Sequence, residues 1–293
     1  MSTIGFIGVG TMGAPMARNI ASGGHAVRAF DVSAAALASV AADGITAATS
    51  PTEAAGGADY VITMLPNSSH VEEAAFGPEG FAEAMDRAAL YVDMSTIAPT
   101  ATDSLAARMA ERGIAMVDAP VGRQQQHAVE GKLMIMVGGS ETDVARVRPI
   151  LDLMGDTIVH CGPVGAGSRT KIVNNYMSIT LNVLSAEALL LAERSGLDPE
   201  IARKVMMGTA AGQGHFGSTY PAKVLKGDLA PGFMIELALK DLGLALELAR
   251  QIDSPVKTGS VAEQVYRAAR DSGRGREDWT AIYAMMRGQT GAG

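Results

Sequence analysis

The stretch Thr3–Gly13, TIGFIGVGTMG, decides the fold of the first half of the chain. Its first part, Thr3 to Gly8, is a short apolar run of the kind buried in a parallel sheet, and the glycine motif Gly8-Val9-Gly10-Thr11-Met12-Gly13 follows it. A helical segment comes next, then a second strand from His25 to Phe30, with Asp31 at its end. This order of strand, glycine turn, helix, strand and acid predicts a dinucleotide-binding unit.

Each residue of the motif has an expected role toward a cofactor. Gly8 permits the tight turn, Gly10 lets the backbone approach a pyrophosphate, and Gly13 lets the helix pack on the strand. The start of the helix, with Thr11 and Met12, offers free N–H groups to the phosphates. Asp31, 18 residues after Gly13, can bond both ribose hydroxyls, which predicts NAD rather than NADP because a carboxylate repels a 2′-phosphate. A tight turn without a ligand is the alternative.

Further strands continue the predicted sheet: Tyr60–Leu65, Leu90–Asp93, Ala115–Ala119 and Leu133–Val137. Ligands of such sheets lie beyond the carboxyl ends of the strands. Residues just after two of these strands are therefore expected to flank a nicotinamide and its ribose, namely Leu65, Pro66, Ser95 and Thr96. As an alternative, Pro66 ends a strand and Ser95 or Thr96 caps the next helix.

A second decisive stretch is Ser168–Ser195, which contains no Gly or Pro and is expected to form one long helix. Its composition is mostly apolar, so we expect it to be buried on most sides. One polar stripe runs along it at helical spacing: Lys171, Asn174, Asn175, Ser178 and Asn182. Buried polar groups need partners. The partner is a polar substrate, or else the Asn side chains bond neighbouring backbone and Lys171 pairs with a carboxylate.

The glycine-rich segment 162–167 marks the predicted boundary between a sheet domain, residues 1–163, and a second domain, residues 164–293. After Ser195 the pattern is helical to the end and shows no alternation typical of strands. The second domain is therefore expected to be all-helical, with helices at Pro199–Met207, Tyr220–Lys226, Glu236–Ile252, Val261–Asp271 and Asp278–Met286.

Composition narrows the class of partner. The 293 residues suffice for two domains, and the net charge of −7 argues against a nucleic-acid or anionic-membrane partner. The single cysteine, Cys161, excludes an intrachain disulfide and fits a reducing compartment, so a cytoplasmic location is expected. The five histidines show no metal-ligand spacing, and no metal is expected. His215 is a candidate pocket residue.

Four motifs in order give the chain a family resemblance: GFIGVGTMG at 5–13, DAPV at 118–121, GSRTKIVNN at 167–175 and KDLGLA at 240–245. The whole chain resembles the β-hydroxyacid dehydrogenases, which include 3-hydroxyisobutyrate dehydrogenases and tartronate semialdehyde reductases. The resemblance implies an NAD-dependent oxidoreductase that forms a homodimer or homotetramer. It also implies that Lys171 is the catalytic lysine and that Lys240 reaches the cofactor from the helical domain.

One departure from the family concerns the substrate. The usual Ser-Gly-Gly after D-x-P-V is here Gly122-Arg123-Gln124, which resembles the bacterial 3-sulfolactaldehyde reductase branch. The branch resemblance implies that a sulfonate is held by Gly122, Arg123, Asn174, Asn175 and Ser178, and that the reduction yields 2,3-dihydroxypropane-1-sulfonate. Lys171 would act as general acid and base, with Asn175 bonding Lys171 or the substrate oxygen. The alternatives are the semialdehydes of succinate, methylmalonate and tartronate, and, in a different class, a non-catalytic NAD-binding sensor.

Overall fold

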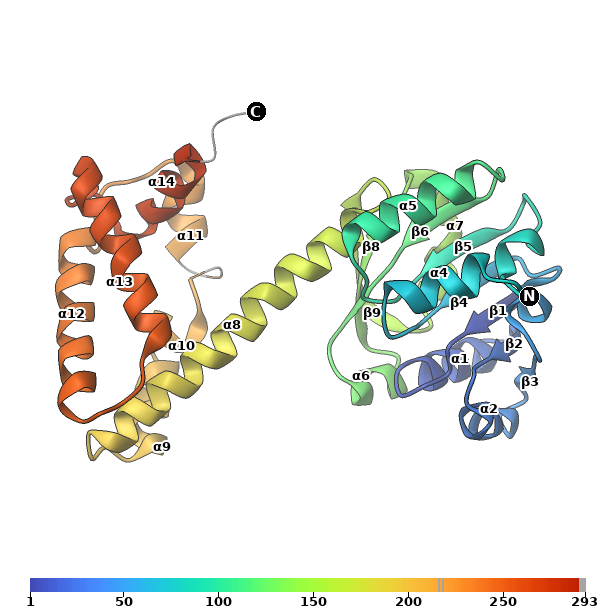
Figure 1. Ribbon diagram of the computed structural model, residues 1–293, viewed down its shortest axis with the longest axis horizontal. Coiled ribbons are helices and arrows are strands. Elements are labelled where there is room, and N and C mark those ends of the chain that lie inside the picture. The colour runs from blue at the N-terminus through green and yellow to red at the C-terminus, as the bar shows by residue number, and fades with distance from the viewer. Residues whose placement is uncertain (216, 218, 290–293) are drawn as a thin grey trace. The chain divides into compact units, whose positions relative to one another are not determined.

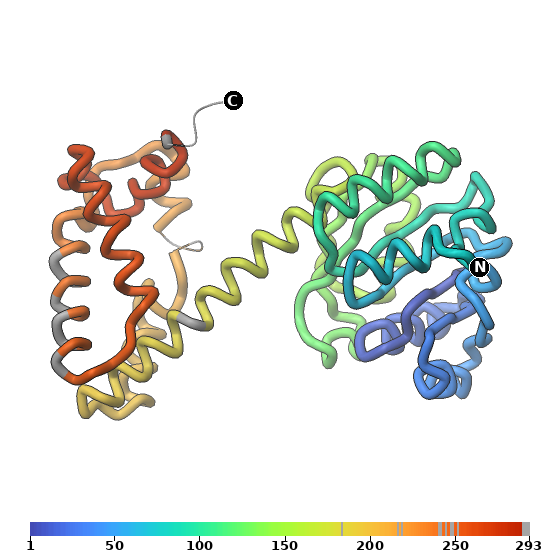
Figure 2. Tube along the Cα trace, viewed as in Figure 1, coloured from blue at the N-terminus to red at the C-terminus, as the bar shows by residue number. Residues whose placement is uncertain are grey.

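The computed structural model describes residues 1–289 except Phe216 and Ser218, and Figure 1 shows its ribbon. Within helices, eight side chains are also not described: Val183, Lys240, Asp241, Leu244, Glu247, Leu248, Gln251 and Gln289. Contacts divide the chain into two compact units, Met1–Tyr176 and Met177–Gly293. The long helix α8 (Ala166–Arg194) begins in the first unit and ends in the second, as the trace in Figure 2 shows. The domain boundary predicted at residue 163 precedes this helix and stays a prediction.

A nine-stranded sheet forms the centre of the first unit, with the order β3-β2-β1-β4-β5-β6-β8-β7 and with β9 paired to β8. Its strands are β1 (Thr3–Ile7), β2 (Ala26–Phe30), β3 (Thr46–Ala47), β4 (Tyr60–Thr63), β5 (Leu90–Asp93), β6 (Ala115–Asp118), β7 (Val121–Gly122), β8 (Leu133–Gly138) and β9 (Gly155–Gly162). The strands from β1 to β6 pair in parallel, whereas β8 runs antiparallel to β6 and β7. The predicted Rossmann-type parallel sheet is confirmed. The strands that follow β1 in sequence, β2 and β3, lie on one side of it, and β4 and β5 lie on the other side. Folds of this type bind nucleotides at the point between β1 and β4 where the strand order changes side.

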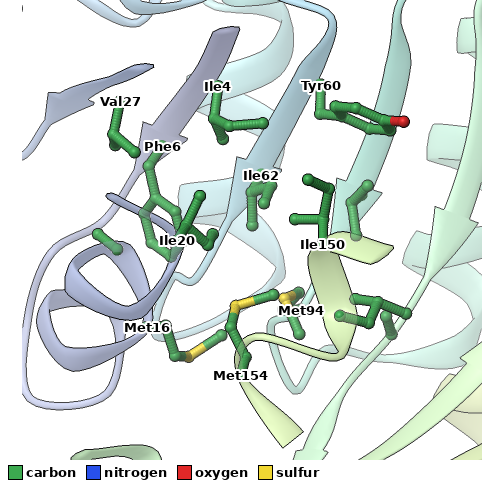
Figure 3. Packing of buried hydrophobic residues seen from close by; sticks show 14 of the residues in the cluster. Ile4, Phe6, Met16, Ile20, Val27, Tyr60, Ile62, Met94, Ile150 and Met154 are labelled. Atoms are coloured by element: carbon green, nitrogen blue, oxygen red, sulfur yellow. The ribbon is translucent and has the colours of Figure 1, made fainter. Parts of the chain in front are cut away.

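Helices cover both faces of this sheet (Figure 1). They are α1 (Gly13–Ser22), α2 (Ala34–Ala41), α3 (Pro51–Ala55), α4 (Ser68–Phe76), η1 (Phe81–Glu83), α5 (Pro99–Ala110), α6 (Gln125–Val129) and α7 (Glu141–Leu151). Successive residues of a strand face opposite sides, so Ile62 packs in one apolar cluster and Val61 in the other. Figure 3 shows the first cluster, in which Met16 and Ile20 of α1 and Ile150 of α7 gather with Ile62.

The second unit is all-helical, as predicted, over the residues that the structure describes. After α8 it contains α9 (Pro199–Met207), α10 (Ala210–Gln213), α11 (Thr219–Ala222), η2 (Val224–Lys226), α12 (Ile235–Gln251), α13 (Lys257–Ala269), η3 (Arg270–Arg274), η4 (Trp279–Ala281) and α14 (Ile282–Gln289). Its buried apolar cluster consists of Ile235, Ala269, Ala281 and Met285. Within the described part of the chain, no helix combines the length and the apolar character that a bilayer crossing needs.

The long helix α8 confirms the prediction of one continuous helix but not its burial. We expected it to be buried on most sides, and for a single chain this is wrong: Val173 is 68%, Tyr176 72% and Ile179 66% exposed. Composition reports how much apolar surface a helix carries, but it does not say whether the same chain covers that surface. A run of exposed large apolar side chains is typical of a surface that another molecule covers.

Candidate functional site

The glycine turn after β1 has the geometry that the motif requires. Gly8 adopts φ +96°, and a Cβ placed there would lie 2.3 Å from the carbonyl oxygen of Met64. A Cβ on Gly13 would lie 1.9 Å from the carbonyl oxygen of Gly8, so α1 starts directly against the turn. Gly10, by contrast, has no heavy atom within 4 Å of an added Cβ. Two of the glycines are therefore required by packing, and the third leaves open space beside the turn.

That open space belongs to a cavity of about 680 Å³ at the carboxyl ends of β1, β2 and β4. Eight of the predicted cofactor residues line it: Gly8, Gly10, Thr11, Met12, Gly13, Asp31, Leu65 and Pro66. Thr96 is exposed and is not among the lining residues. The lining also includes residues that the sequence did not single out, namely Pro51, His70, Glu73, Pro78 and Glu79. These five lie in segments whose patterns are those of ordinary helices and turns, so no motif pointed to them.

Asp31 links the glycine turn to the end of β2. Its Oδ2 accepts the backbone N–H of Val9 at 2.9 Å, and its Oδ1 accepts the N–H of Ser33 at 2.8 Å. The next side chain, Val32, is 94% exposed and carries no charge. The carboxylate therefore places negative charge at the mouth of the cavity, in the position where dinucleotide-binding folds contact a ribose.

The loops after β4 and β5 support each other through buried hydrogen bonds. The N–H of Leu65 donates to Ser95 Oγ at 2.9 Å, and the N–H of Ser95 donates to Asp93 Oδ1 at 3.1 Å. Thr63 Oγ1 donates to the same Asp93 oxygen at 2.8 Å. The alternative role of Ser95 or Thr96 as a helix cap is wrong, because α5 begins after Ala98, which has no side-chain cap. Ser95 instead fixes the backbone of Leu65 at the cavity wall.

Asp93 is a buried carboxyl with an unusual environment. Burial raises its pKa from 3.8 to about 6, although its hydrogen bonds with Ser95 and Thr63 act in the opposite direction. Its second oxygen, Oδ2, has no hydrogen-bond partner among the described residues. The neighbouring Tyr91 hydroxyl, also buried, bonds Thr63 at 2.9 Å. Ionised Asp93 is therefore poorly solvated, and its charge costs stability.

We expect Asp93→Asn to stabilise the protein at alkaline pH. The pKa is higher in the folded protein than in the unfolded chain, so the folded state binds more protons between these values and stability falls as pH rises from 3.8 to about 6. Asparagine is neutral, like the protonated carboxyl group, and it does not ionise. The variant therefore does not lose stability as the pH rises. The increase in the free energy of unfolding should be on the order of 1–3 kcal/mol near pH 8 and about 1 kcal/mol smaller near pH 5. Urea denaturation followed by circular dichroism measures it, and an equal gain at both pH values would contradict the prediction.

The polar stripe of α8 starts at Lys171, whose ammonium is half-buried. Burial lowers the pKa of Lys171 below 10.5. No described residue accepts a hydrogen bond from its Nζ, so the alternative of a carboxylate pair finds no support there. Asn174 Nδ2 donates to Asn175 Oδ1 at 3.4 Å, and the Asn174 side chain is exposed. Ser178, one turn further along the helix, is exposed as well.

Arg123 has a different environment from the one expected for a free anion-binding group. Its guanidinium donates to Asp156 Oδ1 at 2.6 Å, to Thr157 Oγ1 at 3.1 Å and to the carbonyl of Lys132. Its backbone has φ +76°, in the left-handed region that favours glycine. Gly122, just before it, is buried in β7. An ion pair this exposed contributes little to stability, so an incoming anion can replace Asp156 at low cost.

Lys240, predicted to reach the cofactor, lies in α12, and its side chain is outside the described part of the structure. His215, the remaining pocket candidate, contacts groups of its own unit. Its Nδ1 lies 2.7 Å from Thr219 Oγ1, and its ring packs edge-on against Trp279 with centroids 4.7 Å apart. No group of three His, Cys, Asp or Glu that could hold a metal ion occurs among the described residues.

The cavity at the glycine turn lies in a parallel sheet, and the helix that follows this sheet in sequence carries a half-buried lysine. Together these features are typical of nicotinamide-dependent oxidoreductases. Comparison with known proteins agrees. Residues 3–162 match the NAD-binding domain of 6-phosphogluconate dehydrogenase, and residues 165–286 match a domain described as NAD-binding of NADP-dependent 3-hydroxyisobutyrate dehydrogenase. The chain belongs to the 3-hydroxyisobutyrate dehydrogenase-like family, whose members are NAD(P)-dependent oxidoreductases acting on CH–OH groups.

Individual relatives are similar over nearly their whole length. The 3-sulfolactaldehyde reductase of Escherichia coli is 48% identical over 291 residues, which cover 99% of this chain and 98% of the relative. The 2-(hydroxymethyl)glutarate dehydrogenase of Eubacterium barkeri is 39% identical, with 98% and 96% covered. Among solved structures, the 3-hydroxyisobutyrate dehydrogenase of Mycobacterium tuberculosis with L-serine has a TM-score of 0.70 at 35% identity, with 98% and 99% covered.

Proposed function

We propose that this protein is an NADH-dependent reductase of a short anionic aldehyde, with 3-sulfolactaldehyde as the favoured substrate and 2,3-dihydroxypropane-1-sulfonate as the product. The observation that carries the proposal is Lys171, a half-buried amine with a lowered pKa and no acceptor among the described residues. Burial favours the neutral form of an amine, so the ammonium of Lys171 gives up its proton more readily than an exposed lysine does. The 48% identity to the reductase of Escherichia coli supports the choice of substrate.

The mechanism requires a hydride, which a nicotinamide cofactor supplies when bound. The open side of Gly10 and the cavity beside it fit such a group. During reduction, negative charge develops on the carbonyl oxygen of the aldehyde, and Lys171 gives that oxygen a proton. Before transfer, the ammonium stabilises the same charge electrostatically. In the oxidative direction Lys171 takes the proton back. Asn175, one turn further along α8, is proposed to hold Lys171 or the substrate oxygen in position.

The proposed cofactor is NAD rather than NADP. The negative charge of Asp31 repels a 2′-phosphate, and the exposed side chain of Val32 offers it no positive charge. We propose that Gly8, Gly10, Thr11, Met12, Gly13, Leu65 and Pro66 complete the site in the cavity, and that Thr96 and Lys240 are further cofactor-binding residues.

We expect kcat/KM with NADH to exceed that with NADPH by at least about tenfold at one fixed aldehyde concentration. Asp31→Ser should narrow this ratio, because the repulsion of the 2′-phosphate is removed. It should also weaken NADH binding, since the bonds to Val9 and Ser33 are lost. Asp43→Ser is a matched control, because Asp43 is an exposed carboxylate paired with Arg18. A preference for NADPH in the unsubstituted protein would show that Asp31 does not select the cofactor.

The head group of the substrate is proposed to bind the backbone N–H of Gly122, the guanidinium of Arg123 and the polar groups Asn174, Asn175 and Ser178. A sulfonate stays ionised at physiological pH, and an arginine offers it charge-assisted donors. One observation favours a second candidate, a dehydrogenase of short β-hydroxycarboxylates. In this structure Arg123 is held by Asp156, and a carboxylate needs fewer donors than a sulfonate. Turnover with matched sulfonate and carboxylate aldehydes distinguishes the two.

A homo-oligomer, dimer or tetramer, is also part of the proposal. The exposed side chains of Val173, Tyr176 and Ile179 on α8 form an apolar surface that a single chain leaves open to water. Sedimentation equilibrium tests this directly, and a monomer at micromolar concentration would contradict it. A cytoplasmic location, expected from the single cysteine, completes the proposal.

A further inference from the structure

Asp118, the last residue of β6, is fully buried and has a role that its motif did not reveal. Its Oδ1 accepts the backbone N–H of Gly165 at 2.6 Å, and its Oδ2 accepts the N–H of Ser168 at 2.6 Å. Both donors belong to the start of α8, where the first N–H groups have no partner inside the helix. One side chain from a distant strand therefore satisfies two helix-terminal donors.

The local sequence explains why a distant residue is needed. Gly165 is the residue before the helix, because its carbonyl accepts the first intrahelical bond, from the N–H of Arg169 at 3.1 Å. In an ordinary capping box, two side chains of the helix itself bond the N–H groups of the cap residue and of the third helical residue. Gly165 has no side chain and adopts φ +88°. The carboxylate of Asp118 makes both of these bonds. Its negative charge also interacts favourably with the positive end of the helix dipole.

Two glycines let the start of α8 approach the sheet closely. A Cβ on Gly138, the last residue of β8, would lie 2.3 Å from Asp118 Oδ1 and 2.8 Å from the N of Gly167. A Cβ on Gly167 would lie 2.4 Å from the carbonyl oxygen of Met136. Ser168 Oγ further bonds Thr102 Oγ1 at 3.0 Å. The first turn of the helix is therefore held by strands β6 and β8 and by helix α5.

We propose that Asp118 is a positioning residue, which caps α8 from the sheet and thereby fixes the place of Lys171, one turn after Ser168. The inference rests on the proposed function, because it concerns the lysine to which that function assigns the proton transfer. Loss of the cap lets the first turn fray or shift, and a misplacement of about 1 Å can lower the rate of a positioned acid by about a hundredfold.

The test compares Asp118→Asn with one matched control variant. Asparagine offers one acceptor oxygen but turns an NH₂ group toward the second N–H. We expect kcat to fall by roughly 10- to 100-fold, while the Kd for NADH, measured by fluorescence titration, changes by less than about threefold. Asp103→Asn is the matched control, because Asp103 pairs with Arg169 on the same turn at 2.7 Å but is exposed. We expect the kcat of this control to stay within about twofold of the unsubstituted protein.

A double-mutant cycle shows whether Asp118 acts through Lys171. In the Lys171→Ala background, Asp118→Asn should cause no further loss of kcat, because the group it positions is absent. A further loss of the full size, or a kcat for Asp118→Asn alone within twofold of the unsubstituted protein, would overturn the inference. If Lys171→Ala alone is fully active, the proposed function itself fails and the inference falls with it.

Amide hydrogen exchange in the unsubstituted protein gives a test that needs no variant to fold. The N–H groups of Gly165 and Ser168 should be protected, because both donate to a buried carboxylate. Exchange of the Ser168 amide at the rate of an unprotected loop amide would show that the cap does not form in solution, and would overturn the inference.

Discussion

Replacement of Lys171 with alanine is expected to lower kcat for aldehyde reduction by about 10² to 10⁴, the range for the loss of a positioned acid. The Kd for NADH should change little, because Lys171 is not among the residues that line the cavity of the glycine turn. Single-turnover stopped-flow measurements, which follow the oxidation of bound NADH, separate chemistry from product release. Lys204→Ala on α9 is a suitable control, because Lys204 is an exposed lysine of the second unit.

The pH dependence of the two directions gives an independent signature of Lys171. Burial lowers its pKa below 10.5, and reduction uses the protonated amine whereas oxidation uses the neutral amine. Reduction should therefore slow as pH rises through the lowered pKa, and oxidation should accelerate through the same value. Lys171→Ala should abolish both transitions. A single-turnover rate near that of the unsubstituted protein would contradict the role of Lys171 as acid and base.

Replacement of Arg123 with glycine is expected to raise KM for 3-sulfolactaldehyde by roughly one to two powers of ten. A charge-assisted hydrogen bond contributes on the order of 1.5–3 kcal/mol, and 1.4 kcal/mol corresponds to a factor of ten. The KM for an uncharged aldehyde of the same length should rise far less. The fold should tolerate the change, because the backbone at this position has φ +76° and glycine adopts it without strain.

The ion pair of Arg123 requires its own control, since Arg123→Gly removes both the guanidinium and its contact with Asp156. Asp156→Asn removes the pair at 2.6 Å but keeps the guanidinium. We expect this variant to bind the sulfonate as well as the unsubstituted protein or better, because one competitor for Arg123 is gone. An equal rise in KM for charged and uncharged aldehydes in Arg123→Gly would show that Arg123 supports the fold. An unchanged KM for both aldehydes would show that Arg123 does not bind the substrate.

Much of the fold could be predicted because its signals are local. The glycine turn, its strands and Asp31 follow one another within a short segment, and sterics permit few other conformations for it. The strands β3, β7 and β9 were missed for physical reasons. The first two have only two residues each, and β9 shows no regular alternation of polar and apolar residues and runs into a glycine-rich segment. Pairing with β2 and β8 specifies them, and such pairing is a property of the assembled sheet.

The candidate site was predictable to a similar extent. Spacing on a helix placed Lys171 in a polar stripe, and the family resemblance implied its catalytic role. The buried carboxyl groups Asp93 and Asp118 gave no periodic signal, because their importance depends on the groups that folding brings to them. The Gly165 and Ser168 amides come from far along the chain, and so does the Asp156 carboxylate that holds Arg123. The burial of α8 was overestimated for the same reason, since exposure depends on surfaces that no single segment contains.

The central claim is that this chain transfers hydride to a short anionic aldehyde and prefers a sulfonate. The measurement that tests it most directly is NADH oxidation, followed at 340 nm as is usual for this cofactor, with 3-sulfolactaldehyde and with the semialdehydes of succinate, methylmalonate and tartronate at equal concentrations. We predict turnover with the highest kcat/KM for 3-sulfolactaldehyde, by about tenfold or more, as expected if Arg123 adds one charge-assisted bond. A higher kcat/KM for one of the carboxylate aldehydes would contradict the assignment of 3-sulfolactaldehyde as the substrate. No turnover with any of the four aldehydes would contradict the proposed reductase activity and favour a non-catalytic NAD-binding sensor.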